Sequence, residues 1–105
     1  MATNRLEILT QMVALDPGNS FARYGLAMEY ANLGELVTAV TEFESLIARD
    51  ENYPAAYYHG GQALEKLGRL DDARKLYQKG FEVTQRTGDA HTRAEIEAAL
   101  SLLPI

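Results

Sequence analysis

The sequence repeats itself at an interval of 34 residues. When the chain is shifted by this interval, residues 30–36 align with residues 64–70, which places Gly34 on Gly68 and Leu36 on Leu70. Apolar residues keep a helical spacing on both sides of each glycine, so each unit reads as helix, tight turn and helix. Self-similarity at this period is typical of a solenoid in which helical hairpins stack side by side.

The repeat divides the chain into four segments, which we expect to form a single domain over residues 1–105. Residues 20–53 and 54–87 are the two full units, and residues 1–19 match the second half of a unit. Residues 88–105 supply a closing helix, because a solenoid needs a final element with one polar side. The predicted fold is an all-α solenoid of antiparallel helix-turn-helix units.

Turn-forming residues mark the breaks between the expected helices. Pro17 and Gly18 end the first helix, because proline blocks continuation and glycine favours a turn. Gly34 and Gly68 stand where a helix ends and can take the left-handed conformation that closes it. Six helices are expected, at about residues 4–15, 20–33, 36–49, 54–67, 70–85 and 89–102.

The charge distribution and the absence of cysteine exclude several classes of function. The formal net charge of −5 resides in residues 1–53, which hold eight acids against three bases. This half repels nucleic acid phosphates, and it either attracts a basic partner or is a solvated acidic face. No apolar run reaches membrane-spanning length, and the first residues lack the unbroken apolar core of a secretory signal. We therefore expect a soluble cytoplasmic protein without disulfides or thiolate metal sites.

Two sets of residues at equal offsets resemble the tetratricopeptide repeat pattern. The sets are Leu26-Ala27, Tyr30, Ala39 and Phe43 in the first unit, and Gly60-Gly61, Leu64, Ala73 and Tyr77 in the second. Leu15-Asp16-Pro17 resembles the end of a unit in this family, so the resemblance covers about residues 4–86. Arg23 departs from the pattern, which places a large aromatic residue in that slot.

The resemblance implies a right-handed stack in which the first helix of each unit lines a concave groove. Such grooves hold an extended peptide or a partner helix, so the expected function is that of a protein-binding scaffold or adaptor. The expected lining residues are Phe21, Tyr24, Met28 and Asn32 in the first unit, and Ala55, Tyr58, Gln62 and Lys66 in the second. Lys66 and Arg93 are expected to contact acidic groups of the partner.

Tyr24 and Tyr58 occupy the same slot one repeat apart. Their rings are expected either to stand side by side in the groove or to pack against the adjacent repeats. The members of this family that bind chaperone tails grip a terminal carboxylate with a lysine and an asparagine, and here Tyr24 and Met28 occupy those slots. The resemblance therefore favours an apolar or aromatic anchor over a terminal carboxylate.

The half repeat suggests a second function. Its helix lacks the partner helix that would cover Ile8, Leu9 and Met12, and exposed apolar surface of this kind often marks an association site. The alternatives are a homodimer formed through this helix, or a rotation of the helix that buries these residues in its own stack.

Catalysis is not indicated by any pattern of residues. His59 and His91 lack the spacing to carboxylates or to each other that a metal site or a catalytic triad requires, so we expect no enzyme activity, catalytic residue, metal or cofactor. His59 is expected to point toward the groove, either as a solvated surface side chain or as a hydrogen-bond partner of a ligand. Gly60 and Gly61 are attributed to close helix packing. Tyr57, Tyr77 and Phe81 are expected to fill the space left where the second unit has Gly60 and Gly80 in place of two leucines of the first unit.

Overall fold

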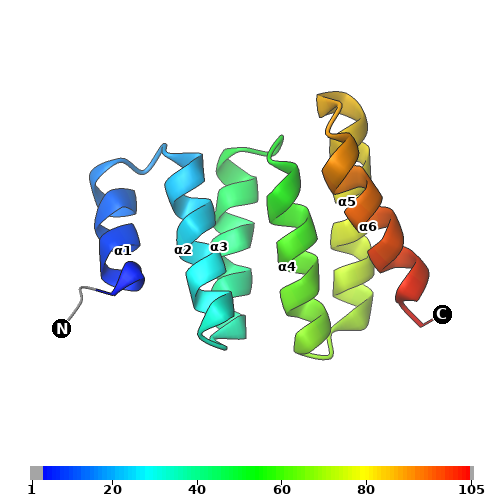
Figure 1. The fold of residues 1–105 in the computed structure, drawn as a ribbon, viewed down its shortest axis with the longest axis horizontal. Helices are drawn as coiled ribbons and strands as arrows, with labels where there is room; N and C mark the ends of the chain where they lie inside the picture. Colours follow the sequence, from blue (N-terminus) through cyan, green and yellow to red (C-terminus); the bar gives the residue numbers. More distant parts are fainter. Residues whose placement is uncertain (1–3, 105) are drawn as a thin grey trace.

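The computed structural model describes residues 4–104 and contains six helices in that range, joined by short turns (Figure 1). The helices are α1 (Arg5–Leu15), α2 (Ser20–Asn32), α3 (Leu36–Arg49), α4 (Pro54–Lys66), α5 (Leu70–Thr87) and α6 (Ala90–Leu102). The described residues contain no strand, so the predicted all-α fold is confirmed. None of these helices is long and apolar enough to cross a membrane.

Successive helices run antiparallel and pack in chain order from α1 at one end to α6 at the other (Figure 1). Helices α2 and α3 form one hairpin, and α4 and α5 form the next. Helices α2, α4 and α6 also contact one another, α2 with α4 and α4 with α6, so they share one face of the stack. We call this the inner face. It contains α2 and α4, the first helices of the two full repeats, which were predicted from the sequence to line the groove.

The turns inside the two hairpins have the same geometry. Gly34 has φ 80° and Gly68 has φ 78°, values that glycine adopts without steric cost. The amide of the next residue then donates to a carbonyl in the preceding helix, Glu35 to Tyr30 and Arg69 to Leu64, each at 2.9 Å. This closure satisfies a helix-end carbonyl in each repeat, so the repeat seen in the sequence corresponds to a repeated local structure.

Close contact between α4 and α5 explains the paired glycines of α4. An ideal Cβ on Gly61 would lie 2.7 Å from Cδ1 of Tyr77, and one on Gly60 would lie 2.9 Å from Cδ2 of Leu76 and 3.3 Å from Cβ of Phe43. The expected close approach is therefore confirmed. Only Tyr77 among the predicted space-filling residues contacts these two glycines, because Leu76 and Phe43 fill the space beside Gly60.

Of the other two residues predicted to fill space in this repeat, Tyr57 does so beside Gly80, as expected, and Phe81 does not. Tyr57 packs against Gly80, where an ideal Cβ would lie 2.5 Å from its Cβ and 3.0 Å from Cδ1 of Ile96. Phe81 is only half-buried and stacks with Arg93 of α6. Phe81 differs because it packs toward α6, a helix that the repeat pattern alone does not orient.

Arg23 occupies the slot in which the repeat pattern places an aromatic residue, and it is buried. Its Nη1 lies 3.4 Å from Oε1 of Glu42 and 3.4 Å from Oγ of Ser45, both on α3. Its Nε is buried without a hydrogen-bond partner among the described residues. A polar contact thus replaces an apolar one inside the first hairpin.

Candidate binding groove

Two hollows lie on the inner face, one on each side of α4. The α2–α4 pocket has a volume of about 170 Å³ and is lined by Met28, Ala31, Asn32, Leu36, His59, Gln62, Ala63 and Lys66. The α4–α6 pocket has a volume of about 360 Å³ and is lined by Tyr58, Gln62, Glu65, Glu95, Ala98, Ala99 and Leu102. Gln62 lines both pockets, so they lie next to each other on the two sides of α4, and we call the two together the groove.

His59 links the two tyrosines that share a slot. Its ring centroid lies 5.8 Å from that of Tyr24 and 4.9 Å from that of Tyr58. Tyr24 also contacts Tyr53, at 5.4 Å, and Tyr58 contacts Tyr77, at 6.3 Å. Among the described residues, the rings of Tyr24 and Tyr58 do not contact each other directly, because the imidazole ring of His59 lies between them.

His59 is half-buried and lines the α2–α4 pocket, so it faces the groove as expected but is not the fully solvated side chain that was one of the two alternatives. Burial lowers the pKa of His59 below its usual range, and Lys66 lowers it further, whereas Glu95 and a hydrogen bond with Gln62 oppose this shift. The net lowering favours the neutral imidazole in the folded protein. A neutral ring packs between two phenol rings without the cost of burying a charge.

Hydrogen bonds hold the polar side chains of α4 in fixed positions. The amide nitrogen of Gln62 donates to the hydroxyl of Tyr58 at 2.8 Å, and the hydroxyl of Tyr77 donates to Oε2 of Glu65. Burial raises the pKa of Tyr58, and the nearby carboxylates of Glu95 and Glu65 raise it further, so the phenol stays protonated. These side chains therefore present a preorganised polar edge to the groove.

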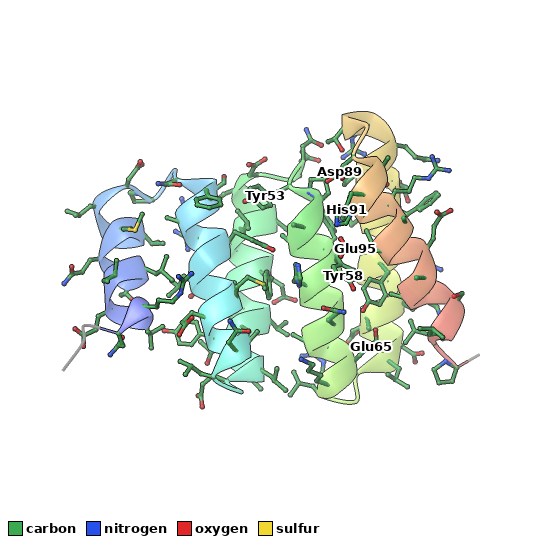
Figure 2. The ribbon with its side chains drawn as sticks, viewed as in Figure 1. Tyr53, Tyr58, Glu65, Asp89, His91 and Glu95 are labelled. Atoms are coloured by element: carbon green, nitrogen blue, oxygen red, sulfur yellow. The ribbon has the colours of Figure 1, made fainter. Side chains whose placement is uncertain are left out.

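The α4–α6 pocket is acidic. Glu65 comes from α4 and Glu95 from α6, and Figure 2 shows both side chains with Tyr58 in the space between the two helices. Glu95 lies 3.6 Å from His91, whose side chain is 86% exposed. The ion-pair partner of Glu95 thus lies mostly in solvent, and no lysine or arginine lines the pocket.

Most of the predicted groove residues lie on the inner face, but they are distributed unevenly. Met28, Asn32, Gln62 and Lys66 line the α2–α4 pocket, and Tyr58 lines the α4–α6 pocket. The remaining groove candidates on α2 and α4 line neither pocket. Tyr24 packs against the ring of His59, Phe21 is exposed near the start of α2, and Ala55 is half-buried near the start of α4.

Arg93 lies away from both pockets. Its guanidinium carbon lies 5.4 Å from the ring centroid of Phe81 on α5. The side chain therefore points toward α5 and away from the side of α6 that lines the groove. Glu95, two residues further along α6, lines the α4–α6 pocket instead of Arg93. The repeat register does not extend into α6, where burial of Ile96 against α5 sets which residues face the groove.

Among the residues that line the α4–α6 pocket, Glu65, Glu95 and Leu102 were not predicted from the sequence. Glu65 follows Tyr58 and Gln62 at offsets of seven and three residues, which places all three on one side of α4, so helical spacing was a sufficient signal for it. Leu102 and Glu95 carried no such signal, because the rotation of α6 is set by packing.

The three residues predicted for self-association separate in the structure. Ile8 and Met12 are 45% and 41% exposed on α1. Leu9 is half-buried and packs on α2, where its Cδ2 lies 3.0 Å from the position of an ideal Cβ on Gly25. Leu9 therefore holds α1 to the stack, and only Ile8 and Met12 remain open to a partner.

Comparison with known proteins places this arrangement among the tetratricopeptide repeats. A sequence model described as "Tetratricopeptide repeat" matches residues 54–87. The curated "TPR repeat-containing protein PA0015" of Pseudomonas aeruginosa is 26% identical over 98 residues, which is 93% of each chain.

Solved structures give the same result. The crystal structure of a tetratricopeptide repeat domain protein from Salinibacter ruber is 35% identical, with a TM-score of 0.75, and the match covers 79% of this chain and 92% of that one. The structure of PcrH in complex with the chaperone binding region of PopD has a TM-score of 0.88 at 20% identity, with 93% of this chain and 74% of that one covered. The second likeness is one of fold.

Proposed function

The chain belongs to the tetratricopeptide repeat family, and we propose that it is a small scaffold that holds an extended segment of a partner protein in the groove on its inner face. The observation that carries this proposal is the pair of pockets that share Gln62, one on each side of α4. An extended peptide that crosses α4 places one side chain in each pocket. The role requires binding and no covalent chemistry.

The α2–α4 pocket suits an apolar side chain. Met28, Ala31, Leu36 and Ala63 supply apolar walls, and methionine adapts its shape to different ligands. Asn32, Gln62 and Lys66 stand at the same pocket and offer hydrogen bonds to the peptide backbone or to an acidic side chain next to the anchor. This combination of apolar walls and a few polar groups is the usual composition of a recognition pocket.

A fold relative supports the choice of a protein segment as ligand. PcrH was solved with the chaperone binding region of PopD, a segment of a second protein. The small volume of each pocket here, about 170 and 360 Å³, also fits single side chains better than a compact domain. We therefore propose a linear peptide as the ligand.

The test uses the full chain and a phage-displayed library of random dodecapeptides. We expect the immobilised protein to enrich peptides with an apolar anchor, and we expect Met28→Glu to raise the Kd of an enriched peptide about tenfold or more, because it places a charge in an apolar pocket. Val37→Glu is the matched control, since Val37 is exposed on α3 and lines neither pocket. Failure to enrich any peptide over empty resin, or equal losses in both variants, would contradict the proposal.

A homodimer formed through α1 is the second candidate function. Ile8, Met12 and Leu15 are exposed and recur at helical spacing on one side of α1, where no other helix covers them. Light scattering of the wild type should then give twice the monomer mass, and Met12→Glu should give the monomer with unchanged helicity. A wild-type protein that scatters as a monomer at high concentration rules this candidate out.

A further inference from the structure

We propose that the α4–α6 pocket receives an arginine side chain of the bound peptide, an inference that rests on the proposed function. Among residues 4–104, the pocket is lined by two carboxylates, an aromatic ring, the amide of Gln62 and apolar side chains, and by no cation. An arginine supplies the complement of each of these, because it combines an apolar stem with a planar cationic head.

The two carboxylates are not neutralised within the protein. No ion pair of the described residues involves Glu65, whose Oε2 accepts a hydrogen bond from the hydroxyl of the buried Tyr77. Glu95 pairs only with His91, which lies in solvent and carries a charge only when it is protonated. Both carboxylates line the pocket beside Tyr58, and both raise the pKa of its hydroxyl, so the two negative charges face one site. A cationic head in the pocket would gain from both.

The remaining walls suit the stem of the side chain. Ala98, Ala99 and Leu102 line the α6 side of the pocket, and the ring of Tyr58 lies across from them on α4. Leu102 is 83% exposed in the free chain, although it is a large apolar side chain. A methylene stem laid over Leu102 would cover apolar surface that no part of the described chain covers.

Geometry favours arginine over lysine or a metal ion. A guanidinium stacks on an aromatic face and donates to two carboxylates at once, whereas an ammonium acts as a single point charge. Ca²⁺ takes six to eight oxygen ligands, and the pocket offers two carboxylates and a phenol. The described residues contain no group of three or more side chains placed to hold a metal.

The two pockets together define a spacing in the peptide. Neighbouring helices pack about 8 to 10 Å apart, and two residues of extended chain advance about 6.6 Å. An apolar anchor in the α2–α4 pocket therefore stands two to four residues from the arginine. Lys66 lines the α2–α4 pocket and repels an arginine there. The arginine is therefore assigned to the α4–α6 pocket and the apolar anchor to the α2–α4 pocket.

The dodecapeptide selection also tests this inference. Peptides enriched on the wild type should share an arginine two to four residues from an apolar residue. Replacing that arginine by citrulline, which keeps the shape and removes the charge, should weaken binding about tenfold or more in fluorescence polarisation. In Glu95→Gln the penalty for citrulline should fall to about threefold, since one of the two charge partners is gone and Glu65 remains.

The matched control is Glu97→Gln, which removes the same charge from an exposed position of α6 outside the pocket and should keep the full citrulline penalty. Glu95 is chosen over Glu65 because the latter is bonded to Tyr77 inside the stack. Circular dichroism verifies that both variants keep their helices.

The outcomes separate the two proposals. A selection that enriches no peptide overturns the groove function and this inference with it. Enriched peptides without an arginine at the stated spacing, a citrulline penalty that stays undiminished in Glu95→Gln, or equal binding of a lysine-substituted peptide would overturn the arginine assignment and leave the groove function standing.

Discussion

The ring of Tyr77 on α5 lies directly against Gly61 on α4, so that an ideal Cβ on Gly61 would fall 2.7 Å from Cδ1 of the ring. The first repeat has Ala27 and Phe43 in the same two slots, and both are fully buried. The second repeat therefore accommodates a larger ring by giving up a methyl group. The tyrosine hydroxyl then reaches Glu65, which it holds at the edge of the groove.

Gly61→Ala is expected to destabilise the protein by about 1 to 2 kcal/mol, because overpacking costs more than the helix gains from alanine. Tyr77 cannot swing away without breaking its bond to Glu65. Gly25→Ala is the control, since its Cβ would meet the two terminal methyl groups of Leu9, the flexible end of a side chain. Urea unfolding measures both variants, and an unchanged midpoint for Gly61→Ala would contradict the overpacking.

Arg23 and Glu42 form an ion pair, and we expect substitutions of the two residues to have opposite effects on stability. Arg23→Leu should leave the free energy of unfolding unchanged or raise it, because it removes the more deeply buried charge and an unpaired Nε, whereas the carboxylate of Glu42 that stays behind is more exposed to water. Glu42→Ala should lower it by about 1 to 3 kcal/mol, since the guanidinium stays behind without its carboxylate. Thermal unfolding of both variants provides the measurement, and a strongly destabilised Arg23→Leu would show that the polar contact is needed.

The half-buried His59 makes stability depend on pH. Burial lowers the pKa of His59 in the folded protein below its ordinary value of 6.5, so the unfolded chain binds more protons between the two values. The stabilisation is fully present above pH 6.5, declines as the pH falls below it, and levels off once the pH is under the folded pKa. His59→Gln should flatten this part of the urea midpoint curve, whereas His91→Gln, at an exposed position, should keep it.

The N-cap of α6 predicts a second, more acidic transition. Oδ1 of Asp89 accepts the amide of Thr92 at 3.0 Å and Oδ2 accepts its hydroxyl at 2.7 Å, and these bonds hold the pKa of Asp89 below its usual 3.8. The stabilisation is present above pH 3.8 and is lost as the pH falls through the folded pKa. Asp89→Ala should cost about 1 kcal/mol at pH 7 and should reduce hydrogen-exchange protection of α6.

Substitutions at Leu9 and Met12 should show which side of α1 packs against α2. Leu9→Glu places a charge against α2 beside Gly25, so it should lower the stability of the stack and the hydrogen-exchange protection of α1. Met12→Glu changes an exposed side chain and should leave both nearly unchanged. Equal loss of protection in the two variants would mean that α1 docks through a different side.

Features that depend on local sequence were predictable. The six helices, the glycine turns at Gly34 and Gly68 and the close packing at Gly61 all follow from spacing and from the conformational freedom of glycine. The positions of Tyr58 and Gln62 in the groove follow from the same register, because α4 lies inside a full repeat.

The groove itself was only partly predictable. Arg93 was expected in it and Glu95 was not, since α6 lies beyond the last full repeat and its rotation is set by Ile96 packing against Gly80. The separation of Tyr24 from Tyr58 by His59 also escaped the pattern, because a repeat register places backbones and leaves ring rotations open.

The sequence by itself determined a stack of helical hairpins, since apolar spacing and turn residues act over a few neighbouring positions. Tertiary structure alone decided which charges meet in the groove, because Glu65 and Glu95 come from helices separated by all of α5. Desolvation and charge pairing are sums over contacts from several elements, and no local pattern encodes such a sum.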